Sequence, residues 1–401
     1  MVAIIGAWRP RLFFRKADTK GGFLLFHSNL MKGTVVAVAM LTASAAFAQD
    51  DVTLPRSMIW TSYDLGSTGY VEASAMADAL DKKFDIAVRL TPSGTAIGRL
   101  LPLVRGRANF GFMGNEILFA SDATYEFAAA DWGPQDLRVL MGRPAAVGLV
   151  AGNDTDVETM DDLKGANVGF VEASPSTTMN TEAALAFAGL TPDDVNKVMY
   201  PGYGAMMSAF VAGEVDVVPV TTTVAALREA EGGRGFHWLD MSADNAEGWD
   251  RVTKRASLFQ PITMTTGAGI SEENPAELLG YSYPQLTTLA STDEDEVYNL
   301  LKALDQVFPD YQNTNAVMPN WNLEKSGRTP AGAPFHPGAV KYLRERGLWT
   351  DADQAWNDQR IAEIEETKEM WAAATAAAKD QGVAPADWVA FWEQYRTRNA
   401  Q

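Results

Sequence analysis

The sequence predicts an α/β fold with two lobes and a helical C-terminal part. Loops rich in Gly, Ser and Thr repeatedly precede apolar residues at helical spacing, and a short run of β-forming residues follows each helix. This alternation occupies 66–116 and returns within 146–223. The chain has 401 residues, which exceeds one typical domain and suits two lobes.

The composition is acidic and contains no cysteine. There are 33 Lys and Arg residues against 51 Asp and Glu, and no basic run alternates with aromatic residues after the N-terminus. Nucleic acid is therefore not expected as a partner. The absence of cysteine excludes disulfides, thiol nucleophiles and cysteine metal sites, and it fits an oxidising compartment.

A secretory signal peptide is predicted at 31–48, within an N-terminal region of 1–48. Its apolar core is followed by Ala-Phe-Ala, which predicts cleavage after Ala48. Residues 1–30 are either an over-extended start, since Met31 is better placed than Met1, or a long basic leader. No later stretch has the roughly 20 apolar residues of a spanning helix. We therefore expect an exported, periplasmic protein that does not itself cross the membrane.

The first lobe is expected to comprise 52–145 together with 256–345. It opens with a strand at 58–61, and two helices follow, each with a short strand after it. The first helix has apolar residues at Tyr70, Ala73, Ala77 and Leu80, and the second has them at Ile97, Leu100, Leu101 and Val104.

The second lobe is expected at 146–255. An apolar run at 137–142 is interrupted by Arg143-Pro144 and resumes at 147–151, which is typical of an edge, a bulge or a crossing between sheets. We interpret it as the first crossover, and 259–289 as the return. Both crossings carry Pro or Gly, so ligand binding is expected to close the lobes about them.

The C-terminal part is predicted to be helical. Asp293 and Glu294 belong to a capped helix start, since acidic residues in a first turn suit the helix dipole. Residues 346–401 form further helices. Their aromatic residues, at spacings of three and four, are expected to pack against the body of the protein.

The hydroxyl-rich helix starts are the candidate ligand site. Free N–H groups and the positive dipole end make such starts a seat for an anion, although each loop taken alone could be an ordinary cap. The candidate ligand-binding residues are Ser67, Thr68, Tyr70, Ser93, Gly94, Thr95, Asn115, Glu116, Arg143, Ser174, Ser176, Thr177, Thr178, Tyr203, Thr221 and Thr222.

Arg143 is the candidate cation of this site. Arg99 and Arg105 are expected on the solvent side of the second helix, whereas Arg143 interrupts an apolar strand whose end should face the cleft. A guanidinium offers five donors in a fixed fork to a carboxylate. The alternative is that Arg143 pairs with a nearby acid such as Asp136 or caps the strand, and both possibilities remain open.

The usual catalytic motifs are missing from the sequence. It contains no G-x-S-x-G, P-loop, H-E-x-x-H or complete G-x-G-x-x-G pattern, and only His237 and His336 remain after the signal peptide. No cofactor, metal or enzymatic activity is expected. Two alternatives stay open: an exported enzyme using Glu116 with Tyr70 or Tyr203 as acid and base, or a periplasmic sensor.

Several segments together resemble a known family. GSTGY, PSGTAIGRLLPLVRGRANFGF, the DLKG and ASPSTT unit, FVAGEVDVVPV and PFHPGAVKYLRERGLW occur in an order similar to that of the TAXI-type solute receptors of TRAP transporters. The resemblance covers roughly 55–350. It implies a type II periplasmic-binding-protein fold that holds a small organic anion, amino-acid or dicarboxylate-like, between two lobes and delivers it to a membrane permease. The loops at Ser67 and Ser174 depart from the family's usual glycine-rich loops.

Overall fold

The computed structural model describes residues 52–399, apart from 64, 66 and 173. The predicted signal peptide, its cleavage site after Ala48 and the segment 1–30 lie outside these described residues and stay predictions. This described part of the chain forms one compact unit.

Ten strands of the described part form one mixed sheet. They are β1 (Ser57–Ser62), β2 (Ala87–Pro92), β3 (Phe110–Met113), β4 (Leu137–Gly152), β5 (Asn167–Val171), β6 (Asn196–Tyr200), β7 (Val217–Thr221), β8 (Phe236–Trp238), β9 (Gln260–Met264) and β10 (Ala276–Leu289). The order is β2-β1-β3-β10-β4-β7-β5-β6, with β8 beside β4 and β9 beside β10. We call β1, β2 and β3 the first strand set, and β5, β6 and β7 the second. Pairing is parallel within each set.

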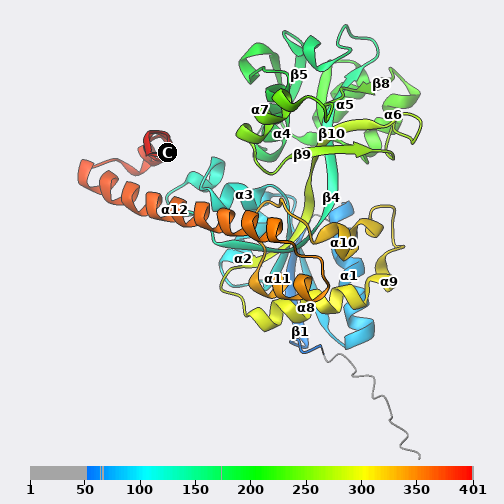
Figure 1. Cartoon of the computed structure of the whole chain (residues 1–401). Helices are drawn as coiled ribbons and strands as arrows, with labels where there is room; N and C mark the ends of the chain where they lie inside the picture. The colour runs from blue at the N-terminus through cyan, green and yellow to red at the C-terminus, as the bar shows by residue number, and fades with distance from the viewer. Residues whose placement is uncertain (1–51, 64, 66, 173, 400–401) are drawn as a thin grey trace, which may run out of the picture. The chain divides into compact units, whose positions relative to one another are not determined.

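The two long strands β4 and β10 connect the two strand sets (Figure 1). β10 pairs antiparallel with β3 near its end, and β4 pairs antiparallel with β7 near its own end. Between these contacts β4 and β10 pair with each other. β4 is one continuous strand through Arg143 and Pro144, not two runs. It is buried at almost every position, which explains its near-continuous apolar sequence.

Helices flank the strands of both sets. Those of eight residues or more are α1 (Thr68–Phe84), α2 (Ala96–Val104), α4 (Pro175–Phe187), α5 (Tyr203–Ala212), α6 (Ala225–Gly232), α7 (Ala246–Arg255), α8 (Glu294–Gln306), α11 (Pro337–Glu345), α12 (Asp351–Gln381) and α13 (Trp388–Asn399). The shorter ones used below are α3 (Glu116–Ser121), η1 (Tyr125–Ala128) and η4 (Met318–Trp321), while α9 (Phe308–Tyr311) and α10 (Leu323–Ser326) lie between α8 and α11.

Local capping signals explain where several of these helices begin. Ser67 accepts a hydrogen bond from the Tyr70 amide at the start of α1. Asp293 accepts one from the Glu296 amide and caps α8, as the sequence predicts. Thr350 forms a capping box that opens α12. The predicted helix starts at Ser67 and Asp293 are therefore confirmed.

The strand pairing bears on the predicted lobe boundaries. β9 pairs with Ala276–Gly280 of β10, and Leu279 lies opposite Val147 of β4. Residues 260–282 are thus paired beside the part of β4 that leads to the second strand set, although they were expected in the first lobe. The boundaries at 52–145 plus 256–345 and at 146–255 stay predictions, and these pairings favour moving 256–282 to the second lobe.

The predicted C-terminal helical part is present as α12 and α13. In Figure 1, α12 extends from the body, and α13 folds back at its far end. The tryptophans of α12 and α13 pack edge to face: the ring centroid of Trp371 on α12 lies 4.9 Å from that of Trp388 and 4.8 Å from that of Trp392, both on α13. Together they form a small apolar cluster with Ala123 and Ala128, which confirms that these aromatics pack against the body.

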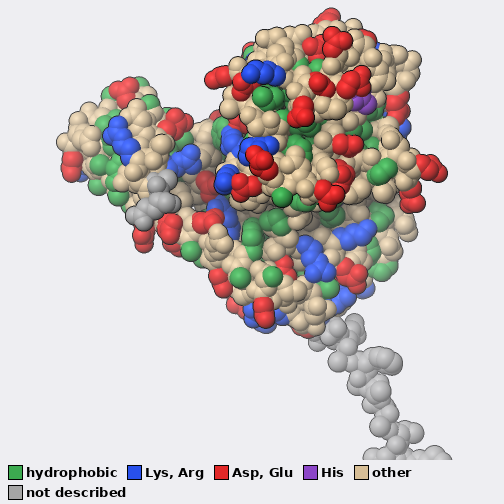
Figure 2. All heavy atoms as spheres, turned by 45° about the horizontal axis from the view of Figure 1, so that its top comes forward, with side chains coloured by type: hydrophobic (Ala, Val, Ile, Leu, Met, Phe, Trp, Pro, Cys, Tyr) green, Lys and Arg blue, Asp and Glu red, His purple; other side chains and the backbone are tan. Residues whose placement is uncertain are grey.

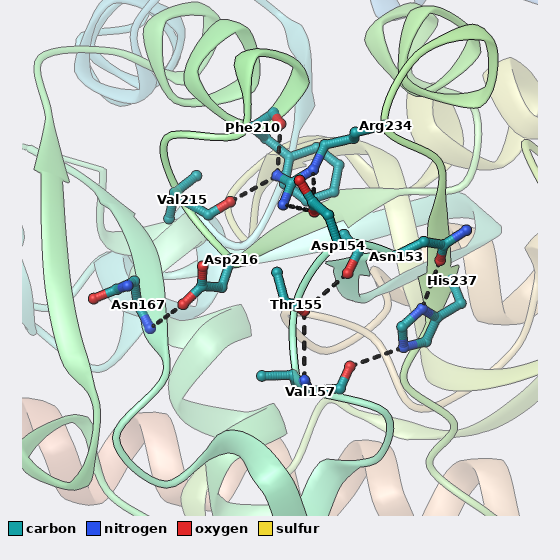
Figure 3. Close-up of polar contacts among 11 residues, drawn as sticks. Asn153, Asp154, Thr155, Val157, Asn167, Phe210, Val215, Asp216, Arg234 and His237 are labelled. Carbon is teal, nitrogen blue, oxygen red and sulfur yellow. Dashed lines mark hydrogen bonds and ion pairs between the residues drawn. The ribbon is translucent and has the colours of Figure 1, made fainter.

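One buried arginine holds together the end of the second strand set (Figure 3). Arg234 Nε donates to Asp154 Oδ1 at 2.8 Å, and Nη1 donates to the carbonyls of Phe210 and Val215 at 2.8 and 2.9 Å. The side chain is only 7% exposed and lies over the Phe210 ring. It therefore ties the end of β4 to α5 and to the start of β7.

The surface agrees with the acidic composition. On the face shown in Figure 2, Asp and Glu side chains are widely spread, with Lys and Arg among them. No helix in the described part is both long and apolar enough to cross a membrane.

Candidate functional site

A bulge in β10 aims Tyr283 at the junction of the two long strands. Ser282 lies opposite Pro144 and Gln285 opposite Gly142, so Tyr283 and Pro284 together oppose the single residue Arg143. A bulge re-aims side chains out of the regular alternation of a strand. Around Tyr283 lie Tyr63, Arg99, Glu116, Arg143, Tyr203 and Tyr281, and we call these seven residues the Tyr283 cluster.

The helices α2 and α3, which flank the first strand set, contribute a buried ion pair to the Tyr283 cluster. Arg99 Nε and Nη2 both donate to Glu116 Oε1, at 3.1 and 2.7 Å, and their side chains are 8% and 3% exposed. The guanidinium lies over the Tyr63 ring, 4.0 Å from its centroid. Burial opposes the charge of Arg99, but Glu116 outweighs it and the pKa of Arg99 is raised. Arg99 therefore keeps its positive charge.

A second ion pair anchors Arg143 to α1. Its Nε donates to Glu72 Oε2 at 3.0 Å and its Nη2 to Glu72 Oε1 at 3.1 Å, while Trp321 Nε1 donates to the same carboxylate at 2.6 Å. The Glu72 side chain is fully buried. No hydrogen bond joins Arg143 Nη1 to any described residue, so two of its protons stay available to another group.

The tyrosines of the Tyr283 cluster are protonated. Burial raises the pKa of Tyr63, Tyr281 and Tyr283, and the Glu116 carboxylate adds to the effect. Tyr203 is the first residue of α5, a helix that flanks the second strand set. Its side chain is 37% exposed, yet desolvation raises its pKa strongly, with a smaller contribution from Tyr283.

A contact between α3 and α4 lies beside this cluster. Asn115 immediately precedes α3, is buried, and donates through Nδ2 to Asn180 Oδ1 of α4 at 3.3 Å. Its own Oδ1 is buried without a hydrogen-bond partner. A buried acceptor in this state is costly, so it is a candidate contact for a bound molecule.

The predicted hydroxyl loops form caps in the structure. Thr95 accepts from the Gly98 amide at 3.0 Å, as Ser67 does from the Tyr70 amide. Ser93 accepts from the Thr95 amide at 3.3 Å, and Ser174 and Thr177 share a hydrogen bond of 2.7 Å. Each of these hydroxyls already has a partner within its own loop. Their role towards a ligand stays a prediction.

The other predicted positions are spread over the same helix starts. Thr68 and Gly94 are exposed, and Thr222 is buried in the turn after β7. The half-buried positions are Tyr70, Ser176, Thr178 and Thr221. Of the sixteen predicted residues, the structure brings Glu116, Arg143 and Tyr203 into the Tyr283 cluster.

The expectation for Arg99 is wrong, and the open alternative for Arg143, pairing with an acid, takes a different form. Arg99 is buried in the Tyr283 cluster and does not lie on the solvent side of α2. Arg143 does pair with an acid, but with Glu72 and not with Asp136, whose partners are Arg138 and Lys368. In both cases the true partner is distant in sequence or lies on another element.

Sequence reasoning missed Tyr63, Tyr281 and Tyr283. The signal was present in the segment Tyr-Ser-Tyr-Pro at 281–284, because alternate strand residues share one face and a proline marks a bulge. Tyr63 directly follows β1, the position from which a parallel strand presents side chains at its carboxyl end.

Other possible sites are less developed. A hollow of about 200 Å³ is lined by Leu101, Pro102, Arg105 and Arg107 at the C-terminal end of α2, and no member of the Tyr283 cluster lines it. Among the residues that the structure describes, no group of three or more His, Cys, Asp or Glu side chains is arranged to hold a metal.

Comparison with known proteins gives the family. Similar solved structures include the periplasmic aliphatic sulphonate binding protein SsuA from Escherichia coli, with a TM-score of 0.41, 18% identity, and coverage of 78% of this chain and 88% of the other. Another is the alkanesulfonate-binding protein SsuA from Xanthomonas axonopodis pv. citri bound to MOPS, with a TM-score of 0.42, 17% identity, and coverage of 78% of this chain and 94% of the other. An ancestral arginine-binding protein bound to arginine has a TM-score of 0.39 and 14% identity, with coverage of 67% of this chain and 99% of the other. Similarity at this level says nothing of what this chain binds. The profile of the NMT1-like family, in contrast, matches residues 65–347, which is most of the chain, and this protein therefore belongs to the NMT1-like family.

Proposed function

We propose that this protein is an extracytoplasmic solute receptor of a TRAP-type transporter, of the TAXI type. It would bind a small organic anion, amino-acid or dicarboxylate-like, between two lobes and deliver it to the permease subunits in the membrane. The predicted signal peptide at 31–48 supports a periplasmic location. The segments that resemble TAXI receptors fall largely within the region matched by the NMT1-like family profile.

The observation that carries this proposal is the state of Arg143. Glu72 fixes one edge of its guanidinium, and no described residue forms a hydrogen bond with Nη1, on a side chain that lies near the protonated Tyr281 and Tyr283. A pre-oriented guanidinium edge next to hydroxyl donors is a favourable environment for a carboxylate. Glu72 and Glu116 balance the charges of Arg143 and Arg99, so a bound carboxylate would depend on directed hydrogen bonds from Arg143 and the tyrosines and not on a net positive charge.

Both strand sets would contribute to the ligand contacts. Arg143 and Tyr283 come from the long strands, Glu116 from the start of α3 after β3, and Tyr203 from the start of α5. The capped loops at Ser67, Thr95 and Ser174 would surround these groups. A ligand held from both sides favours closure of the lobes, as expected for a receptor that presents its cargo to a second protein.

An exported enzyme is the second candidate, and one observation favours it. A methyl group placed on Gly114 would lie 2.9 Å from both Glu116 Oε2 and the Tyr63 hydroxyl, so a carboxylate and a phenol converge there. However, the raised pKa of Tyr63 keeps its hydroxyl protonated near neutral pH, so almost no phenolate is present to act as a base. A periplasmic sensor would use the same ligand site and differ only in its membrane partner.

Mass spectrometry of the material released on denaturation tests the proposal. Protein purified under native conditions should release a small carboxylate, and Arg143→Ala, purified in parallel, should release much less of it. Arg105→Ala serves as the matched control because Arg105 lies outside the Tyr283 cluster. A recovered compound without an anionic group would contradict the proposed ligand class. Following the recovered compound by NMR with fresh protein separates a receptor from an enzyme, since only an enzyme would convert it.

A further inference from the structure

The C-terminal extension, which we define as residues 350–399, holds a short segment of the body. Trp392 Nε1 donates to the Ala123 carbonyl at 2.7 Å, and Trp388 Nε1 donates to the Ala128 carbonyl at 2.9 Å. Arg360 of α12 pairs with Asp122. Three separate side chains of the extension thus bind the segment 122–128, which contains η1 and which we call the η1 segment.

The η1 segment has an uncommon backbone conformation. Ala123 has a φ of 48° and Tyr125 a φ of 53°, in the left-handed region that residues other than glycine seldom adopt. Such residues persist where the surrounding structure over-determines them. The two tryptophan hydrogen bonds fall on carbonyls at either side of Tyr125, so they are well placed to impose this conformation.

The conformation directs Tyr125 towards the helices of the second strand set. Its ring packs edge to face on Phe119 at 4.7 Å, and its hydroxyl accepts a hydrogen bond from Arg255 Nη2 of α7 at 3.2 Å. The same Arg255 pairs with Glu182 of α4. Tyr125 therefore joins the η1 segment to the α4 and α7 pair, close to where Asn115 contacts Asn180.

We propose that the C-terminal extension is a brace that controls how firmly the α4 and α7 pair is held to the first strand set. It acts through the η1 segment, by keeping Tyr125 in place for Arg255. The NMT1-like profile matches only up to residue 347, so the brace lies outside the matched region. The inference depends on no ligand and would stand if the proposed function failed.

Hydrogen exchange of the full chain, followed by mass spectrometry without ligand, tests the brace. Trp392→Phe keeps most of the ring but removes the bond to Ala123, and it should raise exchange about five-fold both in the η1 segment and in peptides from α4 and α7. Trp388→Phe should act in the same direction. Trp356→Phe is the matched control, because this tryptophan lies near the start of α12, packs on the main core and forms no hydrogen bond with the described residues of the η1 segment.

The proposal also predicts coupling from the other side. Tyr125→Phe should raise exchange in α4 and α7 while the η1 segment stays protected. In a double-mutant comparison, Tyr125→Phe should raise exchange in α4 clearly when made in the wild type and only slightly when made with Trp392→Phe. Faster exchange confined to the η1 segment in Trp392→Phe, or equal effects of Tyr125→Phe in both backgrounds, would overturn the proposal and leave the extension as packing only.

Discussion

Arg143 and Glu72 face each other edge to edge, with Nε to Oε2 at 3.0 Å and Nη2 to Oε1 at 3.1 Å, at the point where β4 passes from one strand set to the other. This pair connects the long strand to α1, and Trp321 of η4 completes the coordination of the carboxylate. The ligand proposal and the stability of this region therefore depend on the same carboxylate, and they can be separated by substitution.

Removing the charge of Glu72 should destabilise the fold. Glu72→Gln leaves Arg143 buried without its counter-ion, which costs about 3 to 5 kcal/mol of unfolding free energy. Trp321→Phe removes only one hydrogen bond to a charged acceptor and should cost about 1.5 to 3 kcal/mol. Urea unfolding followed by tryptophan fluorescence measures the first variant, and circular dichroism serves for the second. A smaller loss for Glu72→Gln than for Trp321→Phe would contradict this account.

Removing Arg143 should weaken ligand binding. If its free Nη1 holds an anion, Arg143→Ala loses about 2 to 4 kcal/mol of binding free energy, the range for one partner of a buried charge pair. Titration calorimetry with the compound recovered from the native protein measures this, and Arg105→Ala is the control. Wild-type affinity in Arg143→Ala would shift the binding role to Ser67, Thr95 and Thr177.

A methyl group at Gly114 should disturb the Tyr283 cluster. Its Cβ would lie 2.9 Å from Glu116 Oε2 and from the Tyr63 hydroxyl, and 3.0 Å from the Tyr283 ring. Gly114→Ala should therefore cost about 1 to 3 kcal/mol of stability, as overpacking does, and lower the ligand affinity. Gly232→Ala is the control, since a methyl group there meets nothing within 4 Å, and it should be neutral or stabilising by at most about 1 kcal/mol. Similar melting temperatures for the two variants would refute the prediction.

The pH dependence of stability should contain a contribution from His336. Burial lowers its pKa from the usual 6.5, and the nearby charge of Arg138 acts in the same direction; together they outweigh the opposite effect of the Thr292 carbonyl, which lies 3.0 Å from Nε2. Nδ1 of the neutral ring accepts a hydrogen bond from the Gly338 amide. As the pH falls below about 6.5, the unfolded chain takes up this proton first, so the contribution is complete above that pH and declines towards the lowered pKa.

His336→Asn isolates this contribution. Asparagine can still cap α11 but does not titrate, so the variant should lose less unfolding free energy than the wild type between pH 7 and 5. Urea unfolding at several pH values measures the difference. Parallel pH profiles for the two proteins would show that His336 does not carry the effect.

Arg234 should be hard to replace even by lysine. Lysine cannot bind Asp154 and the carbonyls of Phe210 and Val215 together, so Arg234→Lys should cost about 2 kcal/mol of stability. Arg228→Lys changes an exposed pair on α6 and should stay within about 0.5 kcal/mol. Thermal unfolding of both variants gives the comparison, and equal midpoints would argue against this role of Arg234.

The sequence was informative wherever a feature is local. The caps at Ser67, Thr95 and Asp293 each act on an amide three residues away, so a short window contains the whole interaction. For the same reason the helices of the first strand set and the C-terminal helices could be predicted. The hydroxyl groups of the predicted loops also form their hydrogen bonds within their own loops. They therefore gave no indication of the distant residues that surround Tyr283.

Contacts between residues far apart in the chain could not be predicted from the sequence. Arg99 and Glu116 are 17 positions apart and Arg143 and Glu72 are 71 apart, so neither ion pair follows from helical or strand spacing. The position of Tyr283 depends on the register between β4 and β10, which a single sequence does not specify. The same holds for Trp392, whose partner Ala123 lies 269 positions earlier.

The pairing of β4 with β10 has a mechanical consequence. A rotation of one strand set against the other cannot occur about a single loose bond, because both connecting strands belong to one hydrogen-bonded ribbon. It must be torsion of that ribbon, and two-stranded ribbons accept more twist than wider sheets. The irregular register between Ser282 and Gln285 is where the ribbon has fewest regular bonds and is softest. The ribbon would thus twist most easily beside Arg143 and Tyr283. A molecule bound there would directly change the resistance of the β4–β10 ribbon to twisting.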